Sequence, residues 1–156
     1  MRAKFSACLL AVAATQAAPA QAQQSQARQA QARSAGTVTI EHYYRIKWGS
    51  SGEFMRLYKA NHQPLLEEMK RQGRMLAVRT EEPFTHMAGG QRWDLRVTII
   101  YPDAESAVGT GGAFDSAFDA AQKRLYRDKA KFDAEEARRF SLLEEHWDVV
   151  VTSADE

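Results

Sequence analysis

The segment 92–101 (RWDLRVTIIY) most constrains what this chain can fold into, because its residues alternate in character with a period of two. Alternation that is rich in β-branched and aromatic side chains predicts a β-strand with two distinct faces. The same reasoning predicts strands at 37–48, 74–80 and 147–152. In 92–101 one face would carry Trp93, Leu95, Val97, Ile99 and Tyr101, and the other Arg92, Asp94, Arg96, Thr98 and Ile100.

The segments between these strands carry apolar residues at helical spacing. Ser50 and Glu53 have the spacing of a capping box for the first helix, and Gly73 ends it. Asp103 can cap the second helical region, which breaks at 109–112 (GTGG) and then continues in two pieces to about His146. The apolar positions are Phe54, Leu57, Leu65 and Met69 in the first helix, and Phe114, Phe118, Leu125, Phe132, Phe140 and Leu143 in the second region.

The resulting order, β-α-β-β-α-β, predicts an α+β fold of the ferredoxin-like type. Right-handed crossovers would place the helices on one face of a four-stranded antiparallel sheet. We expect the strand faces that carry Val38, Trp93 and Trp147 to lie under the helices. The opposite, open face would then carry Tyr43, Ile100 and Val150, together with several charged residues.

The first 36 residues do not belong to this domain. Positive charge at Arg2 and Lys4, an apolar run at 5–14 and small-x-small sites ending at Ala20 and Ala22 predict a secretory signal peptide over 1–22. Residues 23–36 are rich in Gln and Ala and predict a disordered linker to a domain at 37–156. The mature protein would be periplasmic or secreted, without a membrane span and without Cys8, the single cysteine.

Composition argues against several classes of partner and site. All 20 Asp and Glu lie in 37–156 with 17 of the 21 Lys and Arg, and no basic stripe stands out, so nucleic acid is not expected as a partner. No two of the four histidines have a close metal-ligand spacing, and Glu41 and His42 point to opposite faces of a strand. The sequence therefore predicts no metal site and no cofactor.

His62 and Pro64 interrupt an otherwise regular helix. Pro64 has no N–H for the carbonyl of Ala60, and it disfavours helical dihedrals at Gln63. We expect the helix to kink there, or to stop near His62 and restart. The imidazole would lie beside unpaired backbone groups, where it either ties down the kinked backbone or takes part in catalysis.

The element His62-Gln63-Pro64-Leu65 resembles that of the EthD-type and related dimeric α/β-barrel families. The segments RWDLRVTIIY and EEHWDV also resemble those of exported bacterial domains without assigned activity. The resemblance implies a homodimer with a central cavity, in a superfamily that includes cofactor-free oxygenases, isomerases and haem-degrading enzymes. The asparagine–tryptophan–histidine set of the haem degraders has no matching positions in this chain.

Side-chain direction predicts where a ligand would lie. Glu41, Tyr43 and Arg45 project from one strand, and Asp94 and Arg96 from its neighbour, onto the face that the helices leave open. Enclosed between two sheets of a dimer, these charges would have to be paired. Any arginine that is not paired with a carboxylate would favour a small anionic or aromatic ligand. The alternative is a sheet face that is simply solvated.

Three functions follow as hypotheses. The first is an exported small-molecule-binding domain that uses the cavity on the sheet face. The second is a cofactor-independent oxygenase or isomerase in which His62 or Tyr43 transfers a proton. The third is a non-catalytic dimeric scaffold whose charges only fix the register of the two subunits.

Overall fold

The computed structural model describes residues 36–85, 87 and 89–152 of the chain. The predicted signal peptide and almost all of the predicted linker lie outside the described residues, as does His86. The elements are β1 (Val38–Ile46), α2 (Ser51–Leu57), a π-helical turn (Tyr58–His62), α3 (Gln63–Arg71), β2 (Ala77–Glu81), a 3₁₀ turn (Gly89–Gln91), β3 (Leu95–Tyr101), α4 (Ala104–Val108), α5 (Ala113–Leu125), α6 (Lys129–Ser141) and β4 (Leu143–Val151).

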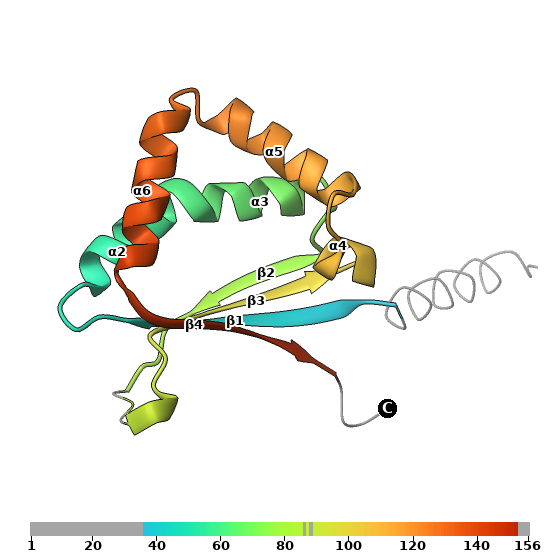
Figure 1. The fold of residues 1–156 in the computed structure, drawn as a ribbon. Coiled ribbons are helices and arrows are strands. Elements are labelled where there is room, and N and C mark those ends of the chain that lie inside the picture. The colour runs from blue at the N-terminus through green and yellow to red at the C-terminus, as the bar shows by residue number, and fades with distance from the viewer. Residues whose placement is uncertain (1–35, 86, 88, 153–156) are drawn as a thin grey trace, which may run out of the picture. The chain divides into compact units, whose positions relative to one another are not determined.

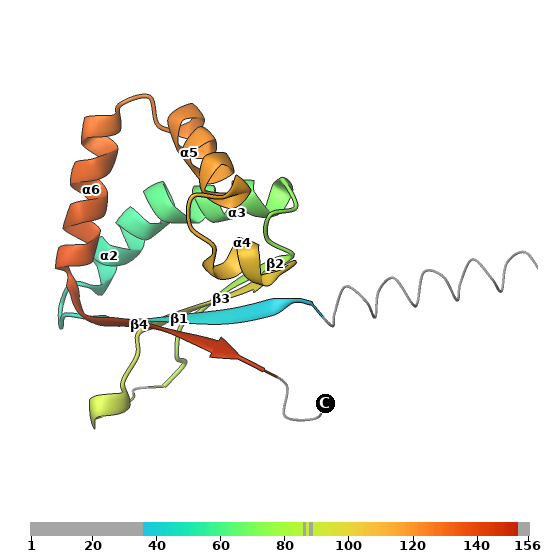
Figure 2. The same cartoon turned by 45° about the vertical axis from the view of Figure 1, so that its right-hand side comes forward.

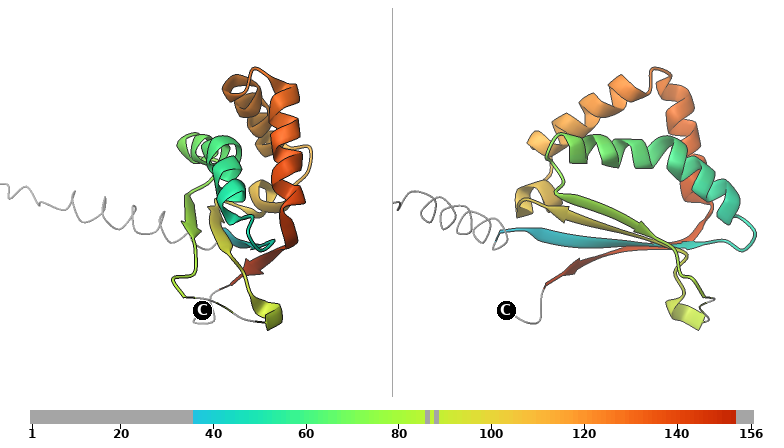
Figure 3. Two further views of the ribbon diagram at one scale, coloured as in Figure 1. Left: turned by 90° about the vertical axis from the view of Figure 1, so that its left-hand side faces the viewer. Right: turned by 180° about the vertical axis from the view of Figure 1, so that it is seen from behind.

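The four strands form one antiparallel sheet in the order β2-β3-β1-β4, which confirms the ferredoxin-like α+β fold. All of the helices from α2 to α6 lie on one side of the sheet (Figures 1 and 2). The connection between β2 and β3 projects from the other side, as the end-on and rear views show (Figure 3). Within the described residues, none of the helices is long and apolar enough to cross a membrane.

The limits of all four strands differ from the predictions: β1 ends at Ile46 and leaves Trp48 exposed, and β2 begins at Ala77 rather than at Arg74. β3 begins at Leu95 rather than at Arg92, since its pairing with β1 ends where Tyr44 lies opposite Leu95. β4 begins at Leu143, so the last helix, α6, ends at Ser141 and not near His146. Residues 142–146 are rich in Leu and Glu and favour a helix locally, but the pairing of β4 with β1 overrides that preference.

The helix ends follow most of the predicted signals. The Asp103 carboxylate accepts a hydrogen bond from the backbone N–H of Ser106 at 2.7 Å, which confirms its capping role. Gly73 has a positive φ of 71°, as expected after the end of α3. The capping box at the start of α2 is wrong: the Ser50 side chain makes no capping bond, and Glu53 pairs with Arg138 of α6 instead.

The interruption at Pro64 takes the form of a π-helical turn. The backbone N–H of Gln63 bonds to the carbonyl of Tyr58, five residues back, and Pro64 then lies in the first turn of α3. The hydroxyl of Tyr126, which follows α5, lies 3.0 Å from the carbonyl oxygen of Ala60 and 2.7 Å from that of Asn61. Pro64 removes the N–H that would bond to the carbonyl of Ala60, and the single hydroxyl hydrogen of Tyr126 is shared between this carbonyl and that of Asn61.

The predicted faces of β1 are confirmed, while those of β4 are wrong. Val38, Ile40, Tyr44 and Ile46 contribute to the core under the helices. On β4, however, Trp147 pairs opposite Tyr43 on the open face, and Val150 pairs opposite Ile40 on the helix side. Trp93 also lies on the open side, because it precedes β3 and its ring makes an edge contact with Tyr43 at a centroid distance of 5.9 Å.

Candidate functional site

A pocket of about 220 Å³ lies between the helix-covered face of the sheet and the helices above it. Its walls are mostly aromatic and aliphatic, and its polar groups are three imidazoles together with the phenols of Tyr44 and Tyr101. The histidines come from β1, the π-helical turn and β4, so the pocket depends on both crossovers of the fold. The lining residues are His42, Tyr44, His62, Leu66, Met75, Val97, Ile99, Tyr101, Phe114, Phe118, Phe140 and His146.

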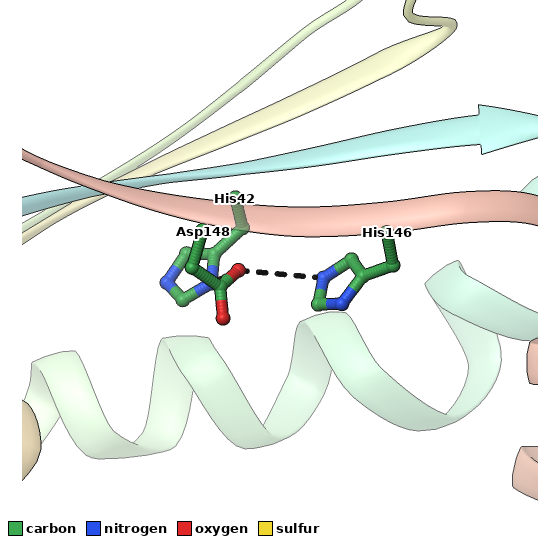
Figure 4. A group of neighbouring side chains, drawn as sticks. All are labelled: His42, His146 and Asp148. Carbon is green, nitrogen blue, oxygen red and sulfur yellow. Dashed lines mark hydrogen bonds and ion pairs between the residues drawn. The ribbon is translucent and has the colours of Figure 1, made fainter.

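His42, His146 and Asp148 form a cluster on the sheet side of this pocket (Figure 4). His42 lies directly opposite Asp148 in the pairing of β1 with β4, and His146 is two residues along the same face. The His42 Nδ1 lies 2.7 Å from the Asp148 Oδ1, and the His146 Nε2 lies 3.5 Å from that oxygen. The His42 Nε2 is buried and has no hydrogen-bond partner among the described residues.

His62 faces the pocket from the π-helical turn. Its ring lies 5.7 Å from that of Tyr58, and its Nδ1 lies 3.9 Å from a carboxylate oxygen of Glu136. Burial, with the charge of Arg139 as a smaller cause, lowers the pKa of His62 to about 3. Burial likewise lowers the pKa of His146. Both imidazoles are therefore neutral at neutral pH, so each keeps a nitrogen lone pair that can accept a hydrogen bond or bind a metal ion.

The open face brings together three of the residues that the sequence predicts for a site. Tyr43 donates a hydrogen bond to Glu41, which raises the pKa of the Tyr43 phenol. Arg96 lies 3.5 Å from Glu41 and binds Glu81 of β2 at 2.8 Å. The positive charge of Arg96 is thus balanced within the chain.

Arg45 lies on the same open face but pairs with a different carboxylate, and Asp94 lies apart from that group. Arg45 pairs with Glu145 of β4 at 3.0 Å, so this arginine is not left over for a ligand either. The Asp94 carboxylate accepts hydrogen bonds from the backbone N–H of Ile46, at 2.7 Å, and from Arg92, at 2.9 Å. Asp94 thus stabilises the end of the sheet near the β2–β3 connection and does not join Arg96 on the open face.

The cluster of His42, His146 and Asp148 is not among the sites predicted from the sequence. Sequence spacing shows ligands that are close along the chain, whereas these three converge across a pair of strands. His146 and Asp148 are two apart and share a face once β4 is known to begin at Leu143. The two-residue spacing of His146 and Asp148 could have indicated that both point to one side of a strand. It was missed because His146 was assigned to the end of a helix.

Two kinds of chemistry suit this arrangement. An imidazole whose Nδ1 donates to a carboxylate keeps a lone pair on Nε2, which is the geometry of an oriented hydrogen-bond acceptor or general base. Two imidazoles and a carboxylate also form a donor set for a divalent transition-metal ion. The apolar walls suit a small molecule with little charge.

No model of a known protein family matches the sequence, and no curated protein matches it. Among solved structures, a dimeric protein of unknown function with a ferredoxin-like fold from Bacteroides fragilis is 8% identical, with 76% of this chain and 97% of that chain covered and a TM-score of 0.44. A NIPSNAP family protein from Agrobacterium tumefaciens is 15% identical, with 77% and 88% covered and a TM-score of 0.41. A dimeric ferredoxin-like protein from an uncultured marine organism is 7% identical, with 76% and 90% covered and a TM-score of 0.46.

Proposed function

We propose that the domain binds a small, weakly polar molecule in the pocket between the sheet and its helices. The observation that carries this proposal is the buried, unpartnered Nε2 of His42, a residue that lines a pocket whose other walls are mainly apolar. A buried polar atom without a partner is costly, and a ligand that supplies a hydrogen bond removes that cost. The site that we propose lies on the side of the sheet opposite to the open face, which is where the sequence predicts a ligand.

The geometry restricts the ligand. A carboxylate offers only lone pairs, so the His42 Nδ1 that bonds to Asp148 carries the proton and Nε2 is an acceptor. The ligand should therefore present a donor, such as a hydroxyl, to Nε2. The pocket volume of about 220 Å³ is below the range of about 300–1,000 Å³ that is typical for drug-sized ligands. A small phenol or a similar aromatic alcohol satisfies both conditions, whereas an anion would find no arginine among the described residues that line the pocket.

Proton transfer is a second candidate function, and the orientation of His42 favours it. Asp148 fixes the ring of His42 and leaves Nε2 directed away from the carboxylate, as in the base of a catalytic dyad. For a cofactor-independent oxygenase or isomerase, His42 would abstract the proton of a bound substrate. His62 lies in the same pocket and could assist, whereas Tyr43 lies on the other side of the sheet. The role of a non-catalytic scaffold would apply if no ligand binds.

Ligand binding measured in two matched variants shows whether the ligand lies in the pocket or on the open face. A panel of small phenols is screened by ligand-observed NMR, with native mass spectrometry of freshly purified protein to detect a retained molecule. Leu66→Trp fills the pocket, and we expect it to abolish ligand binding while circular dichroism shows an intact fold. If the tryptophan prevents folding, Val97→Phe replaces this variant, because it fills the same pocket with a smaller side chain. Arg96→Leu alters only the open face and should leave binding unchanged. The reverse pattern would place the site on the open face.

We further propose that the protein is exported and that its mature form begins near Gln23, after cleavage at Ala22. The charged, apolar and small-residue segments of 1–22 support this proposal. N-terminal sequencing of native protein tests it, and retention of Met1 on cytoplasmic material would refute it. The relation to EthD-type proteins, which depends on the short element from His62 to Leu65, stays a prediction.

A further inference from the structure

We propose that His42, His146 and Asp148 bind a divalent transition-metal ion, such as Zn²⁺, on the sheet side of the pocket. The proposal goes beyond the binding of an organic molecule, because the chain's own side chains suffice to hold the ion. Each residue offers one ligand atom, and the three atoms lie within 4.8 Å of one another (Figure 4). No function discussed above requires these three groups to converge.

The separations between the ligand atoms fit a coordination sphere. Zinc–nitrogen and zinc–oxygen bonds of about 2.0–2.2 Å place neighbouring ligand atoms about 3–3.5 Å apart in tetrahedral or octahedral geometry. The distances of 2.7 Å from His42 and 3.5 Å from His146 to the Asp148 oxygen already lie close to this range. The two histidine nitrogens lie within 4.8 Å of each other, so rotation of an imidazole is enough to complete the coordination sphere.

The scaffold that holds these ligands is rigid. His42 and Asp148 are paired residues of neighbouring strands, so the hydrogen-bonded ladder of β1 with β4 fixes their spacing. His146 is held between the rings of Tyr44, at a centroid distance of 4.4 Å, and Phe140, at 6.1 Å. Metal sites built on strands in this way are preorganised, since little side-chain motion is needed to bind the ion.

The surrounding charges permit a cation. The positive charge of Arg139 acts on His146, and it is compensated by Glu136 at 2.6 Å. Asp148 supplies a negative charge, and its side chain remains 51% exposed. Three protein ligands with an exposed side leave a coordination position for water or for a further ligand, which is typical of catalytic rather than structural zinc sites.

Metal binding would reverse the tautomer of His42. Without an ion, Nδ1 carries the proton and donates to Asp148. With an ion on Nδ1, the single proton of the neutral ring must move to Nε2, which then becomes a hydrogen-bond donor in the pocket. Use of His42 as a general base and use of His42 as a metal ligand therefore exclude each other, and the tautomer tells them apart.

The test uses untagged mature protein that has been treated with EDTA and dialysed. Titration with Co²⁺, followed by its visible absorption, and with Zn²⁺, followed by calorimetry, should give one equivalent per chain. His42→Ala, His146→Ala and Asp148→Asn should each lower the affinity at least about tenfold, since each removes one of three ligands. Glu145→Gln, which changes an exposed carboxylate on the opposite face of the same strand, should leave the affinity unchanged.

NMR of the histidine ring nitrogens supplies an independent readout. Zinc should convert His42 from the form protonated at Nδ1 to the form protonated at Nε2. Absence of cobalt binding, an unchanged tautomer, or equal affinity in Asp148→Asn and the parent protein would each overturn the proposal. A failure of this kind leaves the binding of phenols in the pocket untouched, and a protein that binds zinc but no phenol would refute only the proposed organic ligand.

Discussion

At the scale of the residue, His62 links the pocket to the stability of the fold. Its pKa lies below the ordinary value of 6.5 and is lowered to about 3, because burial disfavours the charged ring. Below pH 6.5 the unfolded chain therefore binds a proton at His62 that the folded chain does not bind. Since protonation then favours the unfolded state, this group lowers stability as the pH falls from 6.5 toward 3.

The corresponding prediction compares the parent protein with His62→Gln. The free energy of unfolding of the parent should fall more steeply between pH 6.5 and 4.5, with an excess slope approaching about 1.4 kcal/mol per pH unit. Urea denaturation at several pH values measures this difference, and the subtraction removes the contribution of His146. Parallel curves for the two proteins would show that the ring of His62 is not held neutral by burial.

Arg139 is a second residue whose environment leads to a prediction. Its side chain is only 1% exposed, lies over the rings of Phe54 and Phe140, and makes two hydrogen bonds to Glu136. Removal of one partner of a buried ion pair leaves an uncompensated charge. We therefore expect Glu136→Gln to lower the free energy of unfolding by about 3–5 kcal/mol in urea denaturation.

The neighbouring pair provides the control for Glu136→Gln. Arg138 and Glu53 make an equally short, two-bond contact, but their side chains are 55% and 40% exposed. Exposed ion pairs contribute little, so Glu53→Gln should lower the free energy of unfolding far less than Glu136→Gln does. Equal losses in the two variants would mean that the Glu136 carboxylate is solvated in the folded protein.

At the scale of the element, the π-helical turn explains the histidine–proline stretch. The sequence correctly predicts an interruption near His62, because a proline inside a helix always removes a backbone donor. It could not predict the form of the interruption, since that depends on Tyr126, which is far away in the sequence. The turn positions His62 in the pocket and places Asn61 where its amide binds Glu135 of α6, at 3.0 Å.

A double-mutant cycle tests this account. Tyr126→Phe removes the hydroxyl that donates a hydrogen bond to the carbonyls of Ala60 and Asn61. We expect this change to lower the free energy of unfolding by roughly 1 kcal/mol. Pro64→Ala restores an N–H that can reach the carbonyl of Ala60. In that background Tyr126→Phe should cost clearly less, as measured by denaturation of all four proteins. Strict additivity would show that the tyrosine and the proline act independently.

The strands were predictable from alternation, but their exact starts and the faces of β4 were not. A shift of one residue in register reverses both faces of a strand, and the alternation in β4 is weak. Trp147 suggested burial under the helices, whereas the structure directs it to the open face and directs His146 and Asp148 inward. Of the candidate site, the sequence therefore located His62 alone, and the rest depended on this register.

At the scale of the whole molecule, the reversed faces of β4 have a consequence for assembly. Trp147, Val149 and Val151 lie on the face without helices, while two polar residues, His146 and Asp148, lie under them. A single chain in water would favour the opposite arrangement. Polar groups under the helices suit a functional site, and the apolar residues on the other face suit a surface that another subunit covers.

The open face has the composition of such an interface. The ring of Tyr43 stacks on that of Trp147 at a centroid distance of 5.2 Å, and Arg45 and Arg96 lie over the rings of Trp147 and Trp93, respectively. Aromatic residues and arginine are enriched at interfaces between proteins. Because these arginines already pair with carboxylates of the same chain, a second subunit would not have to neutralise them.

We therefore predict a homodimer in which two open sheet faces pack together. Light scattering at micromolar concentration should give twice the mass of the mature chain. Trp147→Glu should convert the dimer to a monomer, because it places a charge at the centre of the interface without a partner. Val108→Glu, which changes an exposed apolar residue of α4 on the helix side, should leave the dimer intact. A monomeric parent protein, or equal effects of the two variants, would mean that the aromatic face is open to solvent.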